Sequence, residues 1–311
     1  GAAKRGLLMA HAANAVGSLA LVAVDGLGSA GPADMQLISP QSMDFGKHPR
    51  EFDYHKGKAG RLGILAGSPR YSGAAILTAL GALRAGAGLI TLHAPRAACN
   101  AIRSRLPVEV MLKVCDDPRD ILDESYDALV VGPGLGPCPD SLGAGLRNLI
   151  ESTLIPTLID ADGLNFVAND CSIKLDERHL LTPHPGEFKR LAPDLEGRCR
   201  EEAARAFVQR CRATLLLKGC RTIVAKAGQP LRINSTGTPA MSNGGQGDLL
   251  SGVIGALMAG GMLAFDAGAY GAWLCGRAAE LHVAAHGGIA TATDTASQLG
   301  LAFGNWRTAQ R

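Results

Sequence analysis

Short, continuous apolar runs that alternate with helix-type patterns constrain the fold of this 311-residue chain more than any other feature. Because they are apolar throughout, they predict strands that are covered on both faces by helices. Residues 72–85 show helical spacing, with Ile76, Leu80 and Leu83 on one face. This order predicts an α/β fold with a central, mostly parallel sheet. The predicted strands are residues 61–66, 88–93, 127–131, 156–160, 180–182, 213–217 and 222–225, and helices are predicted at 248–260, 266–286 and 293–303.

Composition excludes several classes of function. Aromatic residues make up only 4% of the chain and the net charge of +3 forms no Lys/Arg stripe, so no nucleic-acid partner is expected. The uncharged run at 249–265 contains glycines and a serine, which favours a buried core helix over a membrane span. The eight cysteines form no C-x-x-C pair, which is typical of free thiols in a reducing compartment and predicts a cytoplasmic protein without a zinc site.

Glycine, proline, aspartate and histidine gather where four of the predicted strands end. The clusters are at residues 67–68, 132–136, 160–162 and 183–187. Any one of them alone is more simply explained as a turn. Ligands of open α/β sheets bind outside the carboxyl ends of the strands, so four clusters in succession predict a ligand-binding edge.

The strongest candidate site lies at the start of the helix predicted from residue 248. Glycines there let main-chain N–H groups converge on an anion, and the helix dipole adds positive potential. Asp248 is then placed to accept a proton from a substrate hydroxyl; the alternative is that it only caps the helix. The predicted anion hole consists of Gly244, Gly245, Gln246 and Gly247.

Two further candidates follow apolar runs. Lys218 opens a glycine-containing turn, residues 218–222, where its charge and the Thr222 hydroxyl suit a phosphate. The alternative is a hairpin with a solvated lysine. On the functional interpretation, replacing Lys218 should weaken nucleotide binding and barely change the melting temperature. His184 lies between two prolines, where it either contacts a substrate or pins the loop, and Glu187 is placed to orient it.

The order of these motifs resembles the ADP/ATP-dependent NAD(P)H-hydrate dehydratases. The resemblance covers about residues 50 to 305 and implies a ribokinase-like fold with helices on both faces of the sheet and no lid domain. No P-loop, dinucleotide-binding G-x-G-x-x-G or G-x-S-x-G motif competes with it. The nine motifs that carry it are residues 55–57, 67–68, 72–75, 86–88, 132–136, 160–162, 181–187, 217–219 and 244–248.

The resemblance implies a repair reaction on (6S)-NAD(P)H hydrate. ADP or ATP, with Mg²⁺ on its phosphates, phosphorylates the ring hydroxyl, and phosphate then leaves to regenerate NAD(P)H. Asp248 is the implied catalytic base, and a homo-oligomer is expected. The family usually has threonine where this chain has Gln246, which keeps the main-chain N–H and loses a hydroxyl contact. The implied substrate-binding residues are Ala75, Gly134, His184 and Asp248, and the implied nucleotide-binding residues are Lys218, Gly219, Cys220, Arg221, Thr222 and Gly247.

Three segments are expected along the chain. Residues 1–31 resemble the end of an NAD(P)H-hydrate epimerase domain, of which they are a remnant, so no epimerase activity is expected. Prolines and polar residues at 32–54 predict an irregular connector. Residues 55–311 form the dehydratase domain.

Two other functions remain open from the sequence. A kinase of the same fold, acting on a sugar or a hydroxymethylpyrimidine, would leave a stable phosphorylated product. A nucleotide-sensing module would bind ADP or ATP without consuming it.

Overall fold

A computed structural model describes residues 4–17, 19, 33–45, 52–137 and 140–310. Its centre is a ten-stranded sheet in the order β1-β10-β9-β8-β7-β6-β5-β2-β3-β4, in which only β9 runs antiparallel to its neighbours. The strands are β1 (Met35–Leu37), β2 (Arg61–Leu65), β3 (Leu89–Ala94), β4 (Met111–Val114), β5 (Ala128–Val131), β6 (Thr157–Ile159), β7 (His179–Leu181), β8 (Thr214–Leu217), β9 (Ile223–Ala225) and β10 (Leu231–Ile233).

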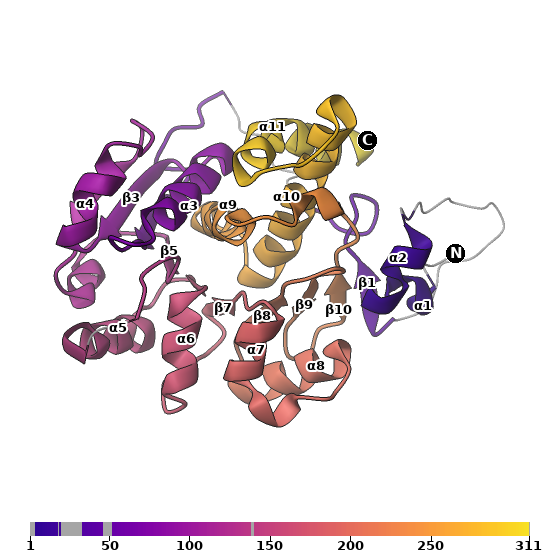
Figure 1. Ribbon diagram of the computed structural model, residues 1–311, viewed down its shortest axis with the longest axis horizontal. Helices are drawn as coiled ribbons and strands as arrows, with labels where there is room; N and C mark the ends of the chain where they lie inside the picture. Colours follow the sequence, from indigo (N-terminus) through magenta and orange to yellow (C-terminus); the bar gives the residue numbers. More distant parts are fainter. Residues whose placement is uncertain (1–3, 18, 20–32, 46–51, 138–139, 311) are drawn as a thin grey trace.

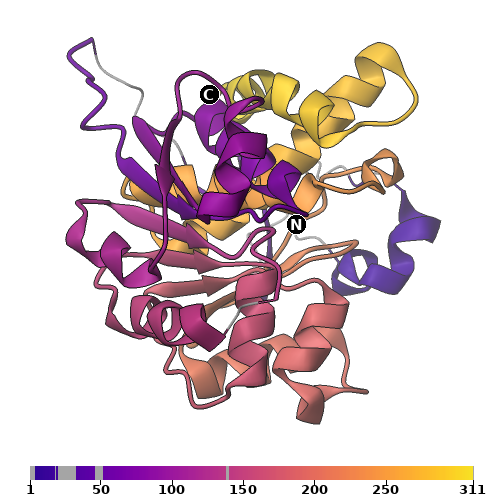
Figure 2. The same ribbon diagram turned by 60° about the vertical axis from the view of Figure 1, so that its left-hand side comes forward.

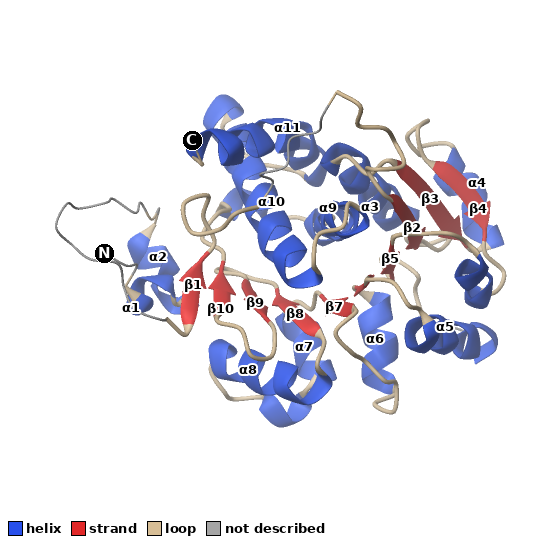
Figure 3. Ribbon diagram, turned by 180° about the vertical axis from the view of Figure 1, so that it is seen from behind, coloured by secondary structure: helices blue, strands red, loops and turns tan. Residues whose placement is uncertain are grey.

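Helices cover both faces of the sheet (Figures 1 and 3). One face carries α3 (Ser72–Ala85), α4 (Arg96–Arg103), α9 (Gln246–Ala259), α10 (Ala264–His286) and α11 (Ala292–Ala309). The other carries η2 (Pro118–Asp123), α5 (Asp140–Ser152), α6 (Asp162–Asn169), α7 (Pro185–Leu191) and α8 (Arg200–Cys211). In the part of the chain described, no lid domain projects from these layers, which Figure 2 shows from a second side.

The predicted α/β fold is confirmed. Side chains along the central strands point alternately into two cores, one on each face of the sheet. Leu62 and Ile64 of β2 belong to the core under α3 and α9, whereas Leu65 belongs to the core under α5 and α6. All seven predicted strands are present, and the helix predicted at 72–85 matches α3 residue for residue. The run at 249–265 divides between the buried α9 and the start of α10. No helix among the described residues is long and apolar enough to cross a membrane.

The expectation of an irregular connector at 32–54 is wrong in its first half. Residues 35–37 form β1, which pairs in parallel with β10 at the end of the sheet. Phe45 is buried and stacks on Trp306, whose indole Nε1 donates a hydrogen bond to the Phe45 carbonyl oxygen (2.7 Å). The segment therefore contributes to the core of the main domain, although its chain is polar and rich in proline.

The N-terminal segment lies beside β1 and β10 (Figure 1). It contains α1 (Arg5–Leu8), η1 (Ala10–Ala12) and α2 (Ala13–Val16), and Leu8 is buried against the core under α8. The epimerase-like pattern at 20–25 lies outside the described residues, so the assignment of residues 1–31 as a remnant stays a prediction.

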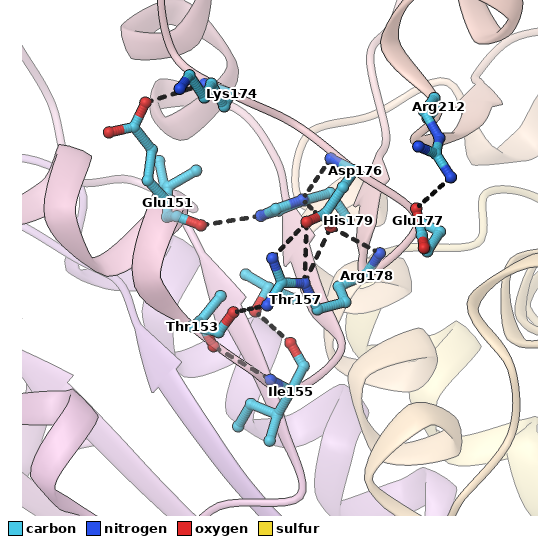
Figure 4. Close-up of polar contacts among 11 residues, drawn as sticks. Glu151, Thr153, Ile155, Thr157, Lys174, Asp176, Glu177, Arg178, His179 and Arg212 are labelled. Atoms are coloured by element: carbon cyan, nitrogen blue, oxygen red, sulfur yellow. Dashed lines mark hydrogen bonds and ion pairs between the residues drawn. The ribbon is translucent and has the colours of Figure 1, made fainter.

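A network of polar contacts lies at the amino-terminal ends of β6 and β7, at the sheet edge opposite the predicted site (Figure 4). Arg178 forms an ion pair with Asp176, and its Nη1 donates to the Thr153 carbonyl oxygen (2.7 Å). His179 is fully buried, and its Nε2 donates to the Ile150 carbonyl oxygen (3.0 Å) while its Nδ1 accepts from the Asp176 N–H (3.1 Å). These partners satisfy the polar groups, as burial requires.

Arg178→Met is expected to lower the free energy of unfolding by about 1–2 kcal/mol near neutral pH, because both the ion pair and the bond to Thr153 are lost. The hydrogen bond from Arg178 holds the pKa of Asp176 at about 2, below its usual 3.8. Such a carboxylate stabilises the fold above its unfolded pKa and loses that contribution as pH falls toward 2. The difference in the free energy of unfolding between wild type and variant, measured by urea titration, should therefore become smaller as the pH falls from 4 to 2. Arg212→Met, which removes only an exposed pair with Glu177, is the matched control.

Candidate functional site

The site begins where the strand order reverses, between β2 and β5, which is where ligands bind in open α/β sheets. The loops that follow the two strands are joined there, because the Gly67 N–H donates to the Pro133 carbonyl oxygen (2.8 Å). Gly134 has a φ of +64° and packs on the start of α3, where a β-carbon would lie 2.7 Å from the Ala74 β-carbon. Glycine is required at this position both for its backbone conformation and for the close approach.

Ala75, a predicted substrate-binding residue, is completely buried. Its β-carbon would lie 2.9 Å from a β-carbon built on Gly67. The side chain therefore supports the turn after β2 from behind.

Two aspartates follow β6 and face different partners. Asp160 is 1% exposed, and its two carboxylate oxygens accept from the Lys218 Nζ (2.8 Å) and the Ser251 hydroxyl (2.7 Å). Asp162 accepts from the Gly136 N–H (2.7 Å), which ties the loop after β5 to the start of α6. Ala161 between them has a φ of +49°, unfavourable for a residue with a side chain, so this turn is held in place by its surroundings.

Lys218 follows β8 in the turn between two antiparallel strands, as the hairpin alternative predicts, but it is not solvated. Its side chain is 18% exposed, and its Nζ contacts Asp160 and lies 3.9 Å from Glu187. Burial alone lowers the pKa of a lysine, but the charges of Asp160 and Glu187 outweigh it and raise the pKa of Lys218. The alternative of a solvated lysine is therefore wrong. We now expect replacement of Lys218 to lower stability, because buried carboxylates would lose their cation.

His184 is the N-cap of α7. Its Nδ1 accepts from the Gly186 N–H (3.0 Å), and Glu187 in turn accepts from the His184 N–H (2.8 Å), which forms a capping box. The predicted role of Glu187 in orienting His184 is confirmed. The Nε2 of the ring lies 3.4 Å from the Glu187 Oε1, and the side chain is 53% exposed, so the ring remains accessible to a ligand.

The four residues of the predicted anion hole lie at the start of α9, two before the helix and two in its first turn. Gly245 is the N-cap with a φ of +92°, and none of the described side chains caps the helix. Asp248 is the third residue of the helix, so the alternative that it is the cap is wrong. Gln246 turns its amide aside and donates to the Ala290 carbonyl oxygen (2.8 Å). A β-carbon on Gly247 would lie 3.4 Å from the Lys218 Nζ, which places the lysine ammonium at this helix terminus.

The surroundings of Asp248 strongly shift the pKa of its carboxyl group. Burial raises the pKa of its carboxyl to about 7, and the negative charge of Asp160 adds to the effect, while Lys218 opposes it. A carboxyl with a pKa near neutrality is suited to general-base chemistry, because it can both accept and release a proton under physiological conditions.

The remaining residues of the loop 218–222 have separate surroundings. Cys220 is exposed, whereas Arg221 is buried and donates to the Ser235 (3.0 Å) and Gly17 (3.3 Å) carbonyl oxygens. The Thr222 hydroxyl donates to the Gly219 carbonyl oxygen (3.1 Å). The loop offers a ligand mainly its backbone and Lys218.

Sequence patterns did not assign roles to two residues of this site. Asp160 ends a predicted strand and belongs to one of the clusters, but the sequence does not indicate that it binds Lys218, 58 positions away. Ser251 lies inside α9 and is fully buried, and nothing in the pattern marks it as the partner of Asp160. Within the described segments, no group of three or more His, Cys, Asp or Glu side chains is placed to hold a metal ion.

A family profile and relatives similar in sequence identify one family. The sequence profile of the NAD(P)H-hydrate dehydratases matches residues 62–300. The bifunctional NAD(P)H-hydrate repair enzyme Nnr of Gloeobacter violaceus is 40% identical over 215 residues, which are 66% of this chain and 42% of that protein. An ADP-dependent (S)-NAD(P)H-hydrate dehydratase of Neisseria meningitidis is 35% identical over 240 residues, which are 75% of this chain and 80% of that protein.

Solved structures extend the comparison to the fold. A Bacillus subtilis ADP/ATP-dependent NAD(P)H-hydrate dehydratase, co-crystallised with ATP/Mg²⁺, is 28% identical, with a TM-score of 0.70 over 83% of this chain and 94% of its own. A ribokinase-like superfamily protein from Enterococcus faecalis shares the fold at 22% identity, with a TM-score of 0.77 over 92% of this chain and 100% of its own. The chain spans less than half the length of the first two bifunctional relatives. The resemblance of the motifs is thus confirmed, and the chain belongs to the NAD(P)H-hydrate dehydratase family.

Proposed function

We propose that this chain dehydrates NAD(P)H hydrate to NAD(P)H at the expense of ADP or ATP. The observation that carries the proposal is the juxtaposition at the start of α9. A carboxyl with a pKa of about 7, Asp248, lies in the first turn of a glycine-rich helix whose N–H groups no side chain caps. Lys218 brings its ammonium to the same turn.

In the proposed reaction, the carboxylate of Asp248 accepts the proton of the ring hydroxyl as that oxygen attacks the terminal phosphorus of the nucleotide. The bond from this phosphorus to the leaving nucleotide oxygen breaks. The ring nitrogen then donates its electron pair, the carbon–oxygen bond breaks, and inorganic phosphate leaves with both electrons of that bond. The resulting iminium ion loses a proton from the neighbouring ring carbon to solvent, which forms the ring double bond of NAD(P)H. Negative charge on the transferring phosphoryl group is stabilised by the dipole of α9, by its free N–H groups and by Lys218.

The membership of the family and the placement of each residue support the binding roles that we propose. His184 and Gly134 line the hydrate side of the site, with Ala75 as its buried support. The backbone of the loop 218–222 and Gly247 hold the nucleotide. Magnesium enters the proposal as part of the nucleotide complex and not as an ion in a protein cage, because Mg²⁺ is commonly bound through substrate phosphates. None of the steps assigned to this chain passes through the metal.

The relatives' second activity is not part of the proposal. The first two bifunctional relatives are more than twice as long as the segment that they match, and the catalytic arrangement described here lies between Gly134 and Ser251. We also propose that the protein is cytoplasmic and forms a homo-oligomer. Residues 1–31 are proposed to be the remnant of an epimerase domain.

The proposal is tested by incubating the chain with NADH hydrate and either ADP or ATP in the presence of Mg²⁺. Recovery of the NADH absorbance together with one inorganic phosphate per NADH is expected. A stable phosphorylated product without NADH would show a kinase instead. Nucleotide binding without consumption would show a sensing module.

A further inference from the structure

Arg200, the first residue of α8, directs its guanidinium into the loop between β8 and β9. Its Nη2 donates to the Leu217 (3.1 Å) and Lys218 (3.0 Å) carbonyl oxygens. Its Nη1 donates to the Cys220 (2.8 Å) and Arg221 (3.5 Å) carbonyl oxygens. All of its hydrogen bonds to described residues therefore go to the main chain of this single loop.

The loop's remaining carbonyl group is also satisfied internally, because Gly219 accepts from the Thr222 hydroxyl (3.1 Å). In a trans peptide the N–H points opposite to the C=O. Fixing the carbonyl oxygens of residues 217–221 on the inner side thus turns the N–H groups of residues 218–222 away from Arg200. The N–H of Lys218 meets the Pro183 carbonyl oxygen (2.8 Å). Those of Gly219 and Arg221 donate to no acceptor in the described part of the chain.

The backbone of the loop is unusual in a way that requires such a partner. Gly219 has a φ of +137° and Arg221 a φ of +58°, and the latter is unfavourable for a residue with a side chain. A β-carbon on Gly219 would lie 3.2 Å from the Arg200 Nη2, so the chain wraps directly over the guanidinium. A lysine could not reproduce this arrangement, because its single ammonium lacks the planar fork that contacts four oxygens.

We infer that Arg200 is a positioning residue for the phosphoryl donor: it holds the loop 217–222 with its carbonyl oxygens inward, so that the opposite N–H groups form a preorganised array for nucleotide phosphate. Successive N–H groups in such a conformation form anion-binding concavities. The inference rests on the proposed function in so far as the anion is an adenine nucleotide. Arg200 does not contact the reacting atoms, which are served by Asp248 and Lys218.

The test compares Arg200→Met and Arg200→Lys with wild type by calorimetric titration of ADP with Mg²⁺ and by steady-state kinetics. Arg200→Met should raise the Kd and KM for ADP about 10- to 100-fold, because the N–H array loses its alignment. The kcat at saturating nucleotide should change much less, because Asp248 and Lys218 keep their places. Arg200→Lys should give an intermediate Kd. Arg210→Met, which removes an exposed ion pair from the same helix, should leave every value unchanged.

Several outcomes would overturn the inference. They are a wild-type Kd for ADP in Arg200→Met, an equal loss of affinity in Arg210→Met, or, should Arg200→Met fail to fold, a wild-type Kd in Arg200→Lys. Failure of wild type to bind ADP would overturn it too. A wild type that binds ADP but regenerates no NADH would contradict the proposed function alone, and a weakened Kd in the Arg200 variants would then still support the positioning role.

Discussion

Asp248→Asn is expected to lower kcat by about 10²–10⁴-fold, the usual cost of losing a general base, and at the same time to stabilise the protein without ligand. Asparagine cannot accept the hydroxyl proton, so turnover is lost. The buried carboxylate also repels Asp160, and this repulsion disappears with the charge. A residue whose removal abolishes activity and raises the melting temperature is functional and not structural.

The direction of the pKa shift of Asp248 determines how its effect on stability changes with pH. The folded state raises the pKa of Asp248 from 3.8 to about 7, so it binds the proton more tightly than the unfolded chain does. Ionisation therefore costs stability, by an amount that is absent below about pH 4, grows toward pH 7 and is complete above it. Thermal unfolding of Asp248→Asn and wild type should differ most near pH 8 and least near pH 4. In wild type, kcat/KM should rise with pH and level off above about 7.

Asp194→Asn is the matched control, because this aspartate is exposed and its ion pair among the described residues is with Arg210. It should leave kcat and its pH profile unchanged. An Asp248→Asn enzyme that retains more than half of the wild-type activity would remove Asp248 from the mechanism. Lost activity with a melting temperature lowered at every pH would instead indicate a structural role for the carboxylate.

The sequence predicts the centre of this fold better than its ends. Buried parallel strands such as β5 and β8 are continuous apolar runs, so their composition alone identifies them. β4 is an edge strand with mostly exposed residues, and β1 and β10 each carry a polar residue at the centre, Gln36 and Arg232, so none of the three is a continuous apolar run. Phe45 joins the core through Trp306, 261 positions away, and no local pattern reports such a contact.

For the site, too, one part is predictable from the sequence and another is not. The clusters at the strand ends converge as predicted, because parallel strands bring their carboxyl ends to one edge and glycine marks the close approaches. The charge environment could not be predicted, since it depends on the depth of side chains that are distant in sequence. From the sequence alone, Lys218 appears dispensable to the stability of the protein, because it follows an apolar run and lies on a glycine-containing turn. Only the fold reveals that Asp160 and Glu187 converge on it.

Lys218→Met is accordingly expected to destabilise the protein by about 3–5 kcal/mol, the usual effect of removing one partner of a buried ion pair. Methionine fills the space of the aliphatic stem but leaves Asp160 almost fully buried without a cation. Urea titrations with and without nucleotide would measure the loss. Lys189→Met removes a lysine from an exposed pair with Glu196 and should cost less than about 1 kcal/mol.

The double variant Lys218→Met/Asp160→Asn separates the electrostatic cause from a packing defect. If the unpaired carboxylate is responsible, neutralising it should restore part of the lost stability, and the two changes should couple by about 1–3 kcal/mol. Ser251 can still donate to the asparagine oxygen, so the neutral side chain keeps a partner. Activity should not return, because the ammonium that faces the transferring phosphate remains absent. Strictly additive losses would mean that Lys218 and Asp160 do not act as a pair, and a stable Lys218→Met would mean that the lysine is solvated in solution.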